Sequence, residues 1–305
     1  MRAVRFHEYG DAGVLRVEEV PEPEPGEGQV SLRVRAAGVN PVDWKILHGM
    51  LDSGPLQEPR GLGVDVAGVV ERVGPGVDDL VPGSEVFGSS ASPAYAEVAL
   101  ADRRLLLVRP PSLPWEVLGS LAVVAGTAYA TLDRLGLREG ETLLLFGASG
   151  GVGLVAAQLA VARGVKVIGT ASEAKLGLVG TLGATPVAYG AGMLERLREQ
   201  APDGVSAVLD ASGHGELSAG VELAGGADRV LTIASYGDAQ ELGVPFHAGG
   251  GGELTVPAMQ EIVTLLEAGS FVFPVAGVYG LGQVADALRE SEHGHPQGKL
   301  VVVPS

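Results

Sequence analysis

The chain has 305 residues, and its 21 basic and 37 acidic side chains give a formal net charge of −16. A surface this acidic repels the phosphates of nucleic acids and of anionic lipids, so we expect neither a nucleic-acid nor a membrane-surface function. No cysteine is present, which excludes disulfides, thiolate catalysis and metal sites with sulfur ligands.

Short β-like runs separated by turns fill the chain from residue 1 to about residue 109. Apolar and polar residues alternate over residues 30–35, as is typical of a half-buried strand. Proline and glycine break the chain at residues 21–25 and 73–76. This pattern predicts an all-β, barrel-like first domain that ends near residue 118.

From about residue 118, short apolar strands alternate with helical stretches. Strands are expected at residues 143–146, 165–169, 207–209 and 230–234, and helices at 153–163, 175–182 and 193–200. This alternation predicts an α/β fold over residues 119–256, with a doubly wound parallel sheet covered by helices on both faces. The uncharged run 142–162 is long enough to cross a bilayer, but its glycines indicate a strand, a loop and a helix instead. The final segment, 257–305, is expected to contain helices at 257–267 and 281–290 and a strand at 299–303.

A glycine-rich turn joins the first strand of this sheet to the helix that follows. The turn reads Gly147-Ala148-Ser149-Gly150-Gly151-Val152-Gly153, which matches the G-x-G-x-x-G pattern of dinucleotide-binding turns except that Ala148 replaces the first glycine. In such a turn the glycines let the backbone approach a pyrophosphate, and the N–H groups of the new helix face the phosphates. We therefore expect residues 148–153 to bind a dinucleotide. The alternative is a glycine-rich turn that binds nothing.

The end of the second strand indicates which dinucleotide is bound. It reads Thr170-Ala171-Ser172, with no carboxylate where NAD-binding proteins place an acidic residue for the ribose 2′-hydroxyl. The small hydroxyl side chains leave room for a 2′-phosphate, and Lys175 can supply the opposite charge. These residues favour NADPH over NADH. The alternative is that Lys175 is an ordinary solvated helix lysine, and the neighbouring carboxylate of Glu173 weighs against NADPH.

Motifs spread over nearly the whole chain resemble those of one superfamily. They are Met1-Arg2-Ala3-Val4, Val20-Pro21-Glu22-Pro23, Gly26-Glu27-Gly28-Gln29-Val30, Ala37-Gly38-Val39-Asn40-Pro41-Val42-Asp43, Gly63-Val64-Asp65-Val66-Ala67-Gly68-Val69-Val70, Ala94-Tyr95-Ala96-Glu97, Gly126-Thr127-Ala128-Tyr129, the turn 148–153, and Gly298-Lys299. With these motifs the chain is similar to the zinc-free medium-chain dehydrogenase/reductase superfamily, in its NADPH:quinone oxidoreductase or zeta-crystallin-like branch. The resemblance implies a GroES-like β-barrel catalytic domain built from residues 1–118 and 257–305, a Rossmann cofactor domain between them, and a homodimer.

The resemblance also implies a mechanism. Zinc-dependent relatives hold their metal with a cysteine and a Gly-His-Glu element, whereas this chain has no cysteine and reads Gly63-Val64-Asp65 at that element. Only His293 and His295 are close in sequence, and we expect them in a surface loop. We therefore expect no metal, and we expect Asp65 to anchor a loop. Without a Lewis acid, the hydride acceptor must already be electrophilic, as quinones and conjugated carbonyl compounds are.

The candidate catalytic residues lie in the segment 40–45. The resemblance implies that the side-chain amide of Asn40, the only asparagine in the chain, faces the nicotinamide and the substrate. Asn40, Pro41 and Asp43 are equally suited to begin a helix, so the alternative for Asn40 is capping. Lys45 stands where quinone reductases of the family carry tyrosine. A buried ammonium there would stabilise an anion and deliver a proton, and the alternative is a solvated lysine.

On the cofactor side, the resemblance implies contacts from six further residues. Thr127 is expected at the nicotinamide amide, Ser172 and Lys175 at the 2′-phosphate, Tyr189 at the adenosine end, and Ser212 and Tyr236 beside the dinucleotide. The implied function is metal-free, NADPH-dependent reduction of a quinone or another conjugated carbonyl compound. Two alternatives stay open: an enoyl or alkenal double-bond reductase, and a catalytically silent nucleotide-binding protein. Acidic residues stand near the N-terminus where a signal peptide would carry its apolar core, so we expect a cytoplasmic protein.

Overall fold

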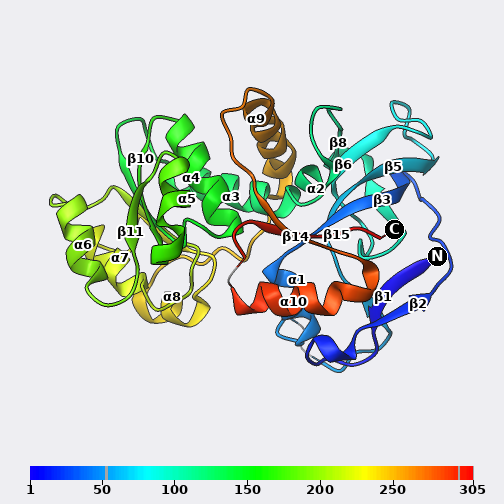
Figure 1. The fold of residues 1–305 in the computed structure, drawn as a ribbon, viewed down its shortest axis with the longest axis horizontal. Coiled ribbons are helices and arrows are strands. Elements are labelled where there is room, and N and C mark those ends of the chain that lie inside the picture. Colours follow the sequence, from blue (N-terminus) through cyan, green and yellow to red (C-terminus); the bar gives the residue numbers. More distant parts are fainter. Residues whose placement is uncertain (52–53, 295, 305) are drawn as a thin grey trace. The chain divides into compact units, whose positions relative to one another are not determined.

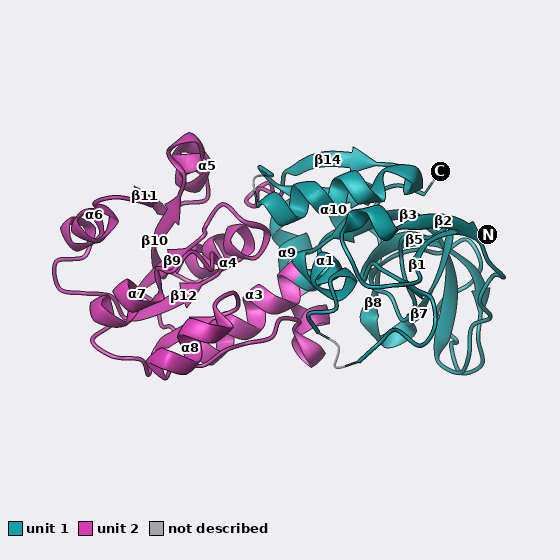
Figure 2. Ribbon diagram, turned by 90° about the horizontal axis from the view of Figure 1, so that it is seen from below, with its two compact units in different colours: residues 1–123, 259–267, 274–305 teal, residues 124–258, 268–273 magenta. Residues whose placement is uncertain are grey.

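The computed structural model describes residues 1–51, 54–294 and 296–304, and it divides into two compact units (Figure 2). Unit 1 comprises Met1–Val123, Met259–Glu267 and Pro274–Ser305. Unit 2 comprises Val124–Ala258 and Ala268–Phe273. The two ends of the chain therefore build one unit, and the middle of the chain builds the other.

Unit 1 is mainly β-structure. A three-stranded sheet has the order β2-β1-β4, with β1 (Arg2–Phe6), β2 (Arg16–Glu19) and β4 (Arg60–Gly61). A larger sheet has the order β14-β15-β3-β5-β6-β8, and β7 also pairs with β3; its strands are β3 (Gln29–Val39), β5 (Asp65–Val73), β6 (Glu85–Ser89), β7 (Val98–Asp102), β8 (Leu106–Val108), β14 (Val275–Tyr279) and β15 (Lys299–Val302). The strand over residues 30–35 is confirmed, with Val30, Leu32 and Val34 buried in the core of this unit. The half-buried alternation is confirmed only in part: Arg35 is exposed, whereas Arg33 is half-buried and Ser31 is completely buried.

Four α-helices contribute to unit 1 (Figure 1): α1 (Pro41–Leu47), α2 (Trp115–Leu118), α10 (Val284–His293) and most of α9 (Thr255–Glu267). Helices α1 and α10 contact each other, and α10 also contacts β15. Short 3-10 turns occur at Ala12–Val14, Arg103–Leu105 and Leu281–Gln283. The expectation that His293 lies in a loop is wrong, because it is the last residue of α10. His295 lies outside the described residues.

Unit 2 is a five-stranded sheet in the order β11-β10-β9-β12-β13, in which every neighbouring pair is parallel. The strands are β9 (Thr142–Phe146), β10 (Lys166–Ala171), β11 (Thr185–Ala188), β12 (Ala207–Asp210) and β13 (Val230–Thr232). The helices are α3 (Ala122–Leu135), which begins in unit 1, and α4 (Gly151–Ala162), α5 (Leu176–Thr181), α6 (Met193–Gln200), α7 (Leu217–Leu223) and α8 (Tyr236–Leu242). Further 3-10 turns occur at Glu173–Lys175 and Gly252–Leu254. The doubly wound α/β fold is confirmed, and the strand order reverses direction between β9 and β12.

The run 142–162 forms β9, a turn and α4, as its glycines indicated. Residues 143–146 are completely buried, and α4 is buried over residues 153–160, so the helix is apolar because it packs inside the unit. Throughout the described residues, no helix combines the length and the apolar character needed to cross a bilayer.

Strand β11 is the one strand of unit 2 that the sequence pattern did not predict. It reads Thr-Pro-Val-Ala, and a proline cannot donate a hydrogen bond to a neighbouring strand. The strand pairs on one side only, with β10, so Pro186 is tolerated at the edge of the sheet. Only Val187 of the four residues is buried, which is too weak an apolar signal to be recognised.

Candidate functional site

The glycine-rich turn leaves β9 at its carboxyl end and is tied to the neighbouring strand. The N–H of Ala148 donates to the Thr170 carbonyl oxygen over 2.9 Å, and the N–H of Gly147 donates to Thr170 Oγ1 over 3.2 Å. Gly147 has φ 77°, a left-handed conformation that favours glycine. A Cβ added to Gly153 would stand 2.1 Å from the Gly147 carbonyl oxygen, so only glycine lets α4 begin this close to the turn.

The N-terminus of α4 is suited to hold an anion. Its N-cap residue, Gly150, makes no side-chain capping bond, so the N–H groups of the first helical turn have no side-chain acceptor at the cap. A Cβ added to Gly150 would meet the Gly147 carbonyl oxygen at 3.4 Å, an ordinary contact distance, so the backbone is not crowded at this residue. Because the helix N-terminus carries a partial positive charge, these residues fit the pyrophosphate of a dinucleotide.

Ser172 and Lys175 follow the carboxyl end of β10 on a single turn. Ser172 is the N-cap of the 3-10 turn Glu173–Lys175, and its carbonyl oxygen accepts the N–H of Lys175 over 2.9 Å. Lys175 is half-buried, and this partial burial lowers the pKa of its ammonium. Glu173, the carboxylate that weighed against NADPH, is exposed. The structure thus brings the two residues expected at the 2′-phosphate onto one turn.

Tyr189 and Ser212 follow the carboxyl ends of β11 and β12, so they lie at the same edge of the parallel sheet as the glycine-rich turn. The ring of Tyr189 is stacked on the ring of His214, with centroids 6.1 Å apart and an angle of 26° between their planes. His214 was not singled out from the sequence. The hydroxyl of Ser212 lies 3.0 Å from Asp210 and 2.7 Å from Glu216, so it is held by two carboxylates.

Asp210, the last residue of β12, organises this edge of the sheet. It is 1% exposed, and one of its oxygens accepts from the N–H groups of Ser212 (2.9 Å) and Gly213 (3.1 Å). Its other oxygen accepts from the hydroxyls of Thr232 (2.7 Å), the last residue of β13, and Ser235 (2.9 Å), which follows that strand. Asp210 was not singled out from the sequence. It could have been, because it is an acidic residue that directly follows the apolar run 207–209.

Thr127 and Tyr236 take different positions in unit 2. Thr127, on α3, is 2% exposed, and its hydroxyl oxygen accepts the N–H of Gly250 over 2.9 Å, which ties α3 to the glycine run 249–252. Tyr236 begins α8 and is 59% exposed. Its ring meets Phe246 edge-on at 5.2 Å, and its hydroxyl accepts from Gln240. The cofactor contacts expected of both residues stay predictions.

In unit 1, Asn40 lies between the end of β3 and the start of α1 and is completely buried. Its Nδ2 donates to Asp65 Oδ2 over 2.9 Å, and its Oδ1 accepts from Lys299 Nζ over 2.6 Å. Its backbone N–H donates to Asp43 Oδ2 over 2.8 Å. The backbone of Asn40 therefore takes the predicted position at a helix start, while its side chain is bonded inside the unit. Its contact with substrate stays a prediction.

The carboxylates around Asn40 have perturbed pKa values. Burial raises the pKa of Asp43 to about 6. Hydrogen bonds from the Tyr95 hydroxyl (2.7 Å) and from the N–H groups of Asn40 and Gly63 lower this pKa, but their effect is smaller than that of burial. Burial also raises the pKa of Asp65, while the Lys299 ammonium lowers it. Asp65 Oδ1 accepts the N–H of Val123 at the start of α3 over 2.7 Å, so Asp65 anchors a helix start rather than a loop.

The titration of Asp43 predicts a pH dependence of stability. Its pKa rises from 3.8 in the unfolded chain to about 6 in the folded one, so its contribution is fully present below pH 4 and is lost as the pH rises through 6. The free energy of unfolding of the wild type, minus that of Asp43→Asn, should fall by about 3 kcal/mol over this range. Urea unfolding followed by tryptophan fluorescence measures this in unit 1, because Trp44 and Trp115, the only tryptophans, both lie there. A difference that does not change with pH would contradict the assignment.

Lys45 is half-buried on α1, and its ammonium lies over the ring of Trp44, 5.5 Å from the ring centroid. Trp44 also meets His48 edge-on, with centroids 6.0 Å apart. This is a cation–π contact between side chains of one helix. Lys45 is therefore directed toward Trp44 and is not an ordinary, fully solvated lysine. Its role as a proton donor stays a prediction.

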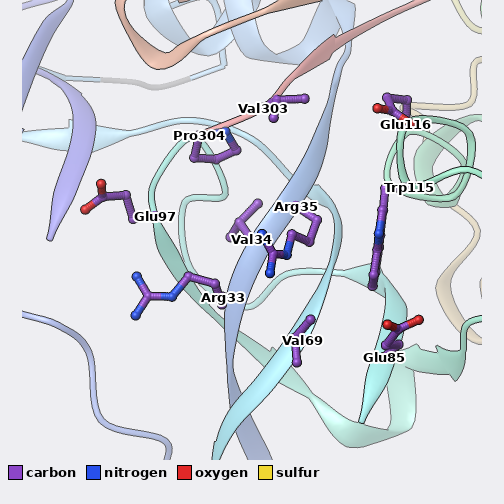
Figure 3. A pocket seen from close by; sticks show the side chains of 10 residues that line it. All are labelled: Arg33, Val34, Arg35, Val69, Glu85, Glu97, Trp115, Glu116, Val303 and Pro304. Atoms are coloured by element: carbon purple, nitrogen blue, oxygen red, sulfur yellow. The ribbon is translucent and has the colours of Figure 1, made fainter. Parts of the chain in front are cut away.

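A hollow of about 490 Å³ in unit 1 lies apart from these residues (Figure 3). It lies beside the middle of β3, between residues 29–33, which pair with β7, and residues 37–39, which pair with β15. The side chain of Arg35 lies opposite the ring of Trp115 in this hollow (Figure 3). Three of its charged side chains are paired with neighbours: Arg33 with Glu71, Glu97 with Arg2, and Glu85 with Arg109. None of the residues expected at the site lines this hollow, which is formed by Arg33, Val34, Arg35, Val69, Glu85, Glu97, Trp115, Glu116, Val303 and Pro304.

Comparisons with known proteins give consistent results. Residues 26–129 match the family described as "Alcohol dehydrogenase GroES-like domain", and residues 182–302 match "Zinc-binding dehydrogenase". The chain is 33% identical over 319 residues to the 2-methylene-furan-3-one reductase of Solanum lycopersicum, covering 100% of this chain and 79% of the relative. It is 32% identical over 327 residues to the quinone oxidoreductase of Homo sapiens, covering 99% and 98%. A solved structure of mycobacterial Rv1454c complexed with NADPH superposes with a TM-score of 0.87 at 29% identity, covering 100% of both chains.

Zinc, which the second family description implies, does not fit this chain. The chain has no cysteine, and nowhere in its described part do three His, Asp or Glu side chains gather as metal ligands. Asp65, which ends the segment Gly63-Val64-Asp65, accepts from the Asn40 amide, and its carboxylate lies 3.9 Å from the ammonium of Lys299. A second cation beside that ammonium would be repelled, so no zinc-dependent step follows from these residues.

Proposed function

The chain belongs to the medium-chain dehydrogenase/reductase superfamily of oxidoreductases, and on that premise we propose that it is a metal-free, NADPH-dependent reductase of quinones and other conjugated carbonyl compounds. The observation that carries the proposal is the glycine-rich turn between β9 and α4, at the point where the strand order reverses. The N-terminus of α4 has no side-chain cap, and its partial positive charge suits a pyrophosphate. The end of β10 supplies Ser172 and Lys175, with no carboxylate at the strand end itself.

The chemistry follows from which groups this chain can supply. Bound NADPH would provide a hydride, and an acceptor that is already electrophilic needs no metal to receive it. The residues of unit 2 would bind and orient the dinucleotide through its phosphates, because a fixed nicotinamide lowers the entropic cost of the reaction. We propose Asn40 and Lys45, both in unit 1, as the groups that would offer a hydrogen-bond donor or an ammonium to negative charge on the acceptor oxygen.

Two alternatives remain candidates. The Solanum lycopersicum relative is named for a ketone conjugated to a methylene group, which supports an alkene reductase with the same cofactor site. A silent nucleotide-binding protein would keep the turn 147–153 but would have no use for Asn40. The difference between these candidates lies in the acceptor, not in the cofactor.

A binding and turnover experiment tests the proposal. NADPH and NADH affinities are measured by cofactor fluorescence, and NADPH oxidation is then followed with a panel of quinones and enones in the presence of a chelator. Turnover that persists with the chelator supports a metal-free reductase, and the preferred acceptor separates quinone from alkene reduction. Tight NADPH binding without turnover of any acceptor would favour the silent binder.

Lys175→Ala should weaken NADPH binding more than NADH binding. An ammonium paired with a phosphate contributes a charge-assisted hydrogen bond, so the loss should be roughly tenfold to hundredfold for NADPH and much smaller for NADH. Lys166→Ala is a matched control, because Lys166 is an exposed lysine at the opposite, amino end of the same strand. Equal losses for both dinucleotides would refute the assignment of Lys175 to the 2′-phosphate.

A cytoplasmic homodimer is also part of the proposal. At one edge of the five-stranded sheet, β11 carries Pro186, which disfavours strand addition there. At the opposite edge, β13 pairs with β12 on one side, and on its other side it forms an isolated bridge from Thr232 to Phe246. We therefore place the dimer contact at the β13 edge, and sedimentation velocity of the wild type and of Phe246→Lys would test it.

A further inference from the structure

Three side chains from distant parts of the sequence meet at one end of the larger sheet of unit 1. Strands β15 and β5 both run antiparallel to β3 and lie on either side of it. The carboxyl end of β3 therefore meets the amino ends of both neighbours. Asn40, which follows β3, stands between Lys299, the first residue of β15, and Asp65, the first residue of β5.

The contacts define which way the Asn40 amide points. Its oxygen accepts from the Lys299 ammonium over 2.6 Å, and its nitrogen donates to the Asp65 carboxylate over 2.9 Å. A flipped amide would place N–H groups against an ammonium and a carbonyl oxygen against a carboxylate, so both contacts would become repulsive. The two opposite charges thus select a single orientation.

The burial of Lys299 shows that this arrangement is costly. The side chain is 6% exposed and that of Asp65 is not exposed at all, and their charged atoms are 3.9 Å apart. Lys299 Nζ also donates to the Val39 carbonyl oxygen over 2.9 Å. A buried ion pair of this kind often contributes less to stability than apolar residues of the same volume would. We therefore look for a geometric role of this ion pair rather than a stabilising one.

We propose that Lys299, together with Asp65, is a positioning residue that holds the side-chain amide of Asn40 in one orientation at the start of α1. The same carboxylate holds the first turn of α3 through the N–H of Val123. This role rests on the proposed function in one respect, because the effect on turnover assumes that Asn40 serves the reaction. The orientation of the amide itself does not depend on that assumption.

A direct test uses the fact that Asn40 is the only asparagine in the chain. Labelling with [15N]asparagine gives a single side-chain amide, whose two proton signals report its surroundings by NMR. In the wild type these signals should be well separated and exchange slowly with water. In Lys299→Met they should shift and exchange at least about tenfold faster, because the oxygen loses its charged partner. Unchanged signals in Lys299→Met would overturn the proposal whatever the protein catalyses.

Measurements of kcat distinguish a Lys299 that positions the Asn40 amide from a Lys299 that only neutralises the charge of Asp65. Lys299→Met leaves the Asp65 carboxylate buried without its counter-charge, and adding Asp65→Asn removes that charge. The double variant should therefore regain most of its stability, measured by tryptophan fluorescence in unit 1. Its kcat should stay about tenfold or more below that of the wild type, because a neutral pair no longer selects the orientation of the amide. Its affinity for NADPH, which binds to unit 2, should stay within about twofold.

A control variant and two further outcomes complete the test. Lys166→Met removes an exposed lysine of unit 2 and should leave the Asn40 signals and kcat unchanged. If the double variant recovers both stability and kcat, Lys299 only balances a charge and the proposal fails. If the wild type reduces no acceptor, the proposed function fails, and the amide signals still decide the role of Lys299.

Discussion

Gly153→Val should abolish dinucleotide binding and distort the first turn of α4. Any Cβ at residue 153 would lie 2.1 Å from the Gly147 carbonyl oxygen and 2.9 Å from the Cα of Ala148, and both of these are backbone atoms of the turn. A backbone atom cannot rotate out of the way, so α4 and the turn must move apart. Overpacking of this kind costs roughly 3 kcal/mol or more. Cofactor fluorescence should show NADPH affinity reduced at least about a hundredfold.

Gly150→Ala is the matched control, three residues earlier in the same turn. Gly150 has φ −81°, which any residue adopts, and its added Cβ would have no neighbour closer than 3.4 Å. We expect this variant to fold with normal hydrogen-exchange protection of β9 and α4, but to bind NADPH more weakly, because its methyl group would stand at the helix N-terminus where we propose that the phosphates bind. If Gly153→Val retained wild-type protection and affinity, the close approach of helix and turn would not be required for binding.

The structural features that could be predicted from the sequence depend on residues that lie close together along the chain. The strand, turn and helix around the glycine-rich turn follow from an apolar run, four glycines and a second apolar run, all within residues 142–162. The doubly wound parallel sheet was predicted from repeated strand and helix units, each encoded by residues that are close in sequence. Ser172 and Lys175 were singled out because they follow the end of β10 directly, and their contact with a 2′-phosphate stays a prediction.

The features that the sequence did not predict depend on residues that meet only in the folded chain. Lys299 was recognised only as part of a motif, and nothing local shows that its ammonium bonds Asn40, which is 259 positions away. Strand β11 was missed because edge strands need neither a full apolar pattern nor every N–H group. The choice between catalysis and capping for Asn40 stayed open for the same reason: its amide is oriented by Asp65 and Lys299, not by its neighbours in sequence.

Asp210→Ala should destabilise unit 2 and weaken the dinucleotide site together. Its carboxylate is the shared acceptor for donors that follow two adjacent strands, β12 and β13, at the edge where the glycine-rich turn lies. Removing it leaves buried N–H and hydroxyl groups without an acceptor, at a cost of about 3–5 kcal/mol. Hydrogen exchange followed by mass spectrometry should show lost protection in peptides that contain β12 and β13. NADPH affinity should fall at least about tenfold, because Ser212 loses the acceptor of its backbone N–H and keeps only Glu216 as a partner of its hydroxyl.

The position at which hydrogen-exchange protection is lost shows whether Asp210 acts by holding the ends of β12 and β13 together. Asp203→Ala removes an exposed carboxylate from the turn before β12, at the opposite end of the same strand, and should leave both protection and affinity unchanged. The unfolding transition of unit 1, followed by tryptophan fluorescence, should also be unchanged in Asp210→Ala, because both tryptophans lie in unit 1. Asp210→Asn keeps the shape of the side chain but places N–H groups against donors, so its effect should fall between those of the wild type and Asp210→Ala. A loss of affinity in Asp210→Ala with full protection of β12 and β13 would mean that the carboxylate acts on the dinucleotide directly and not by holding the two strand ends together.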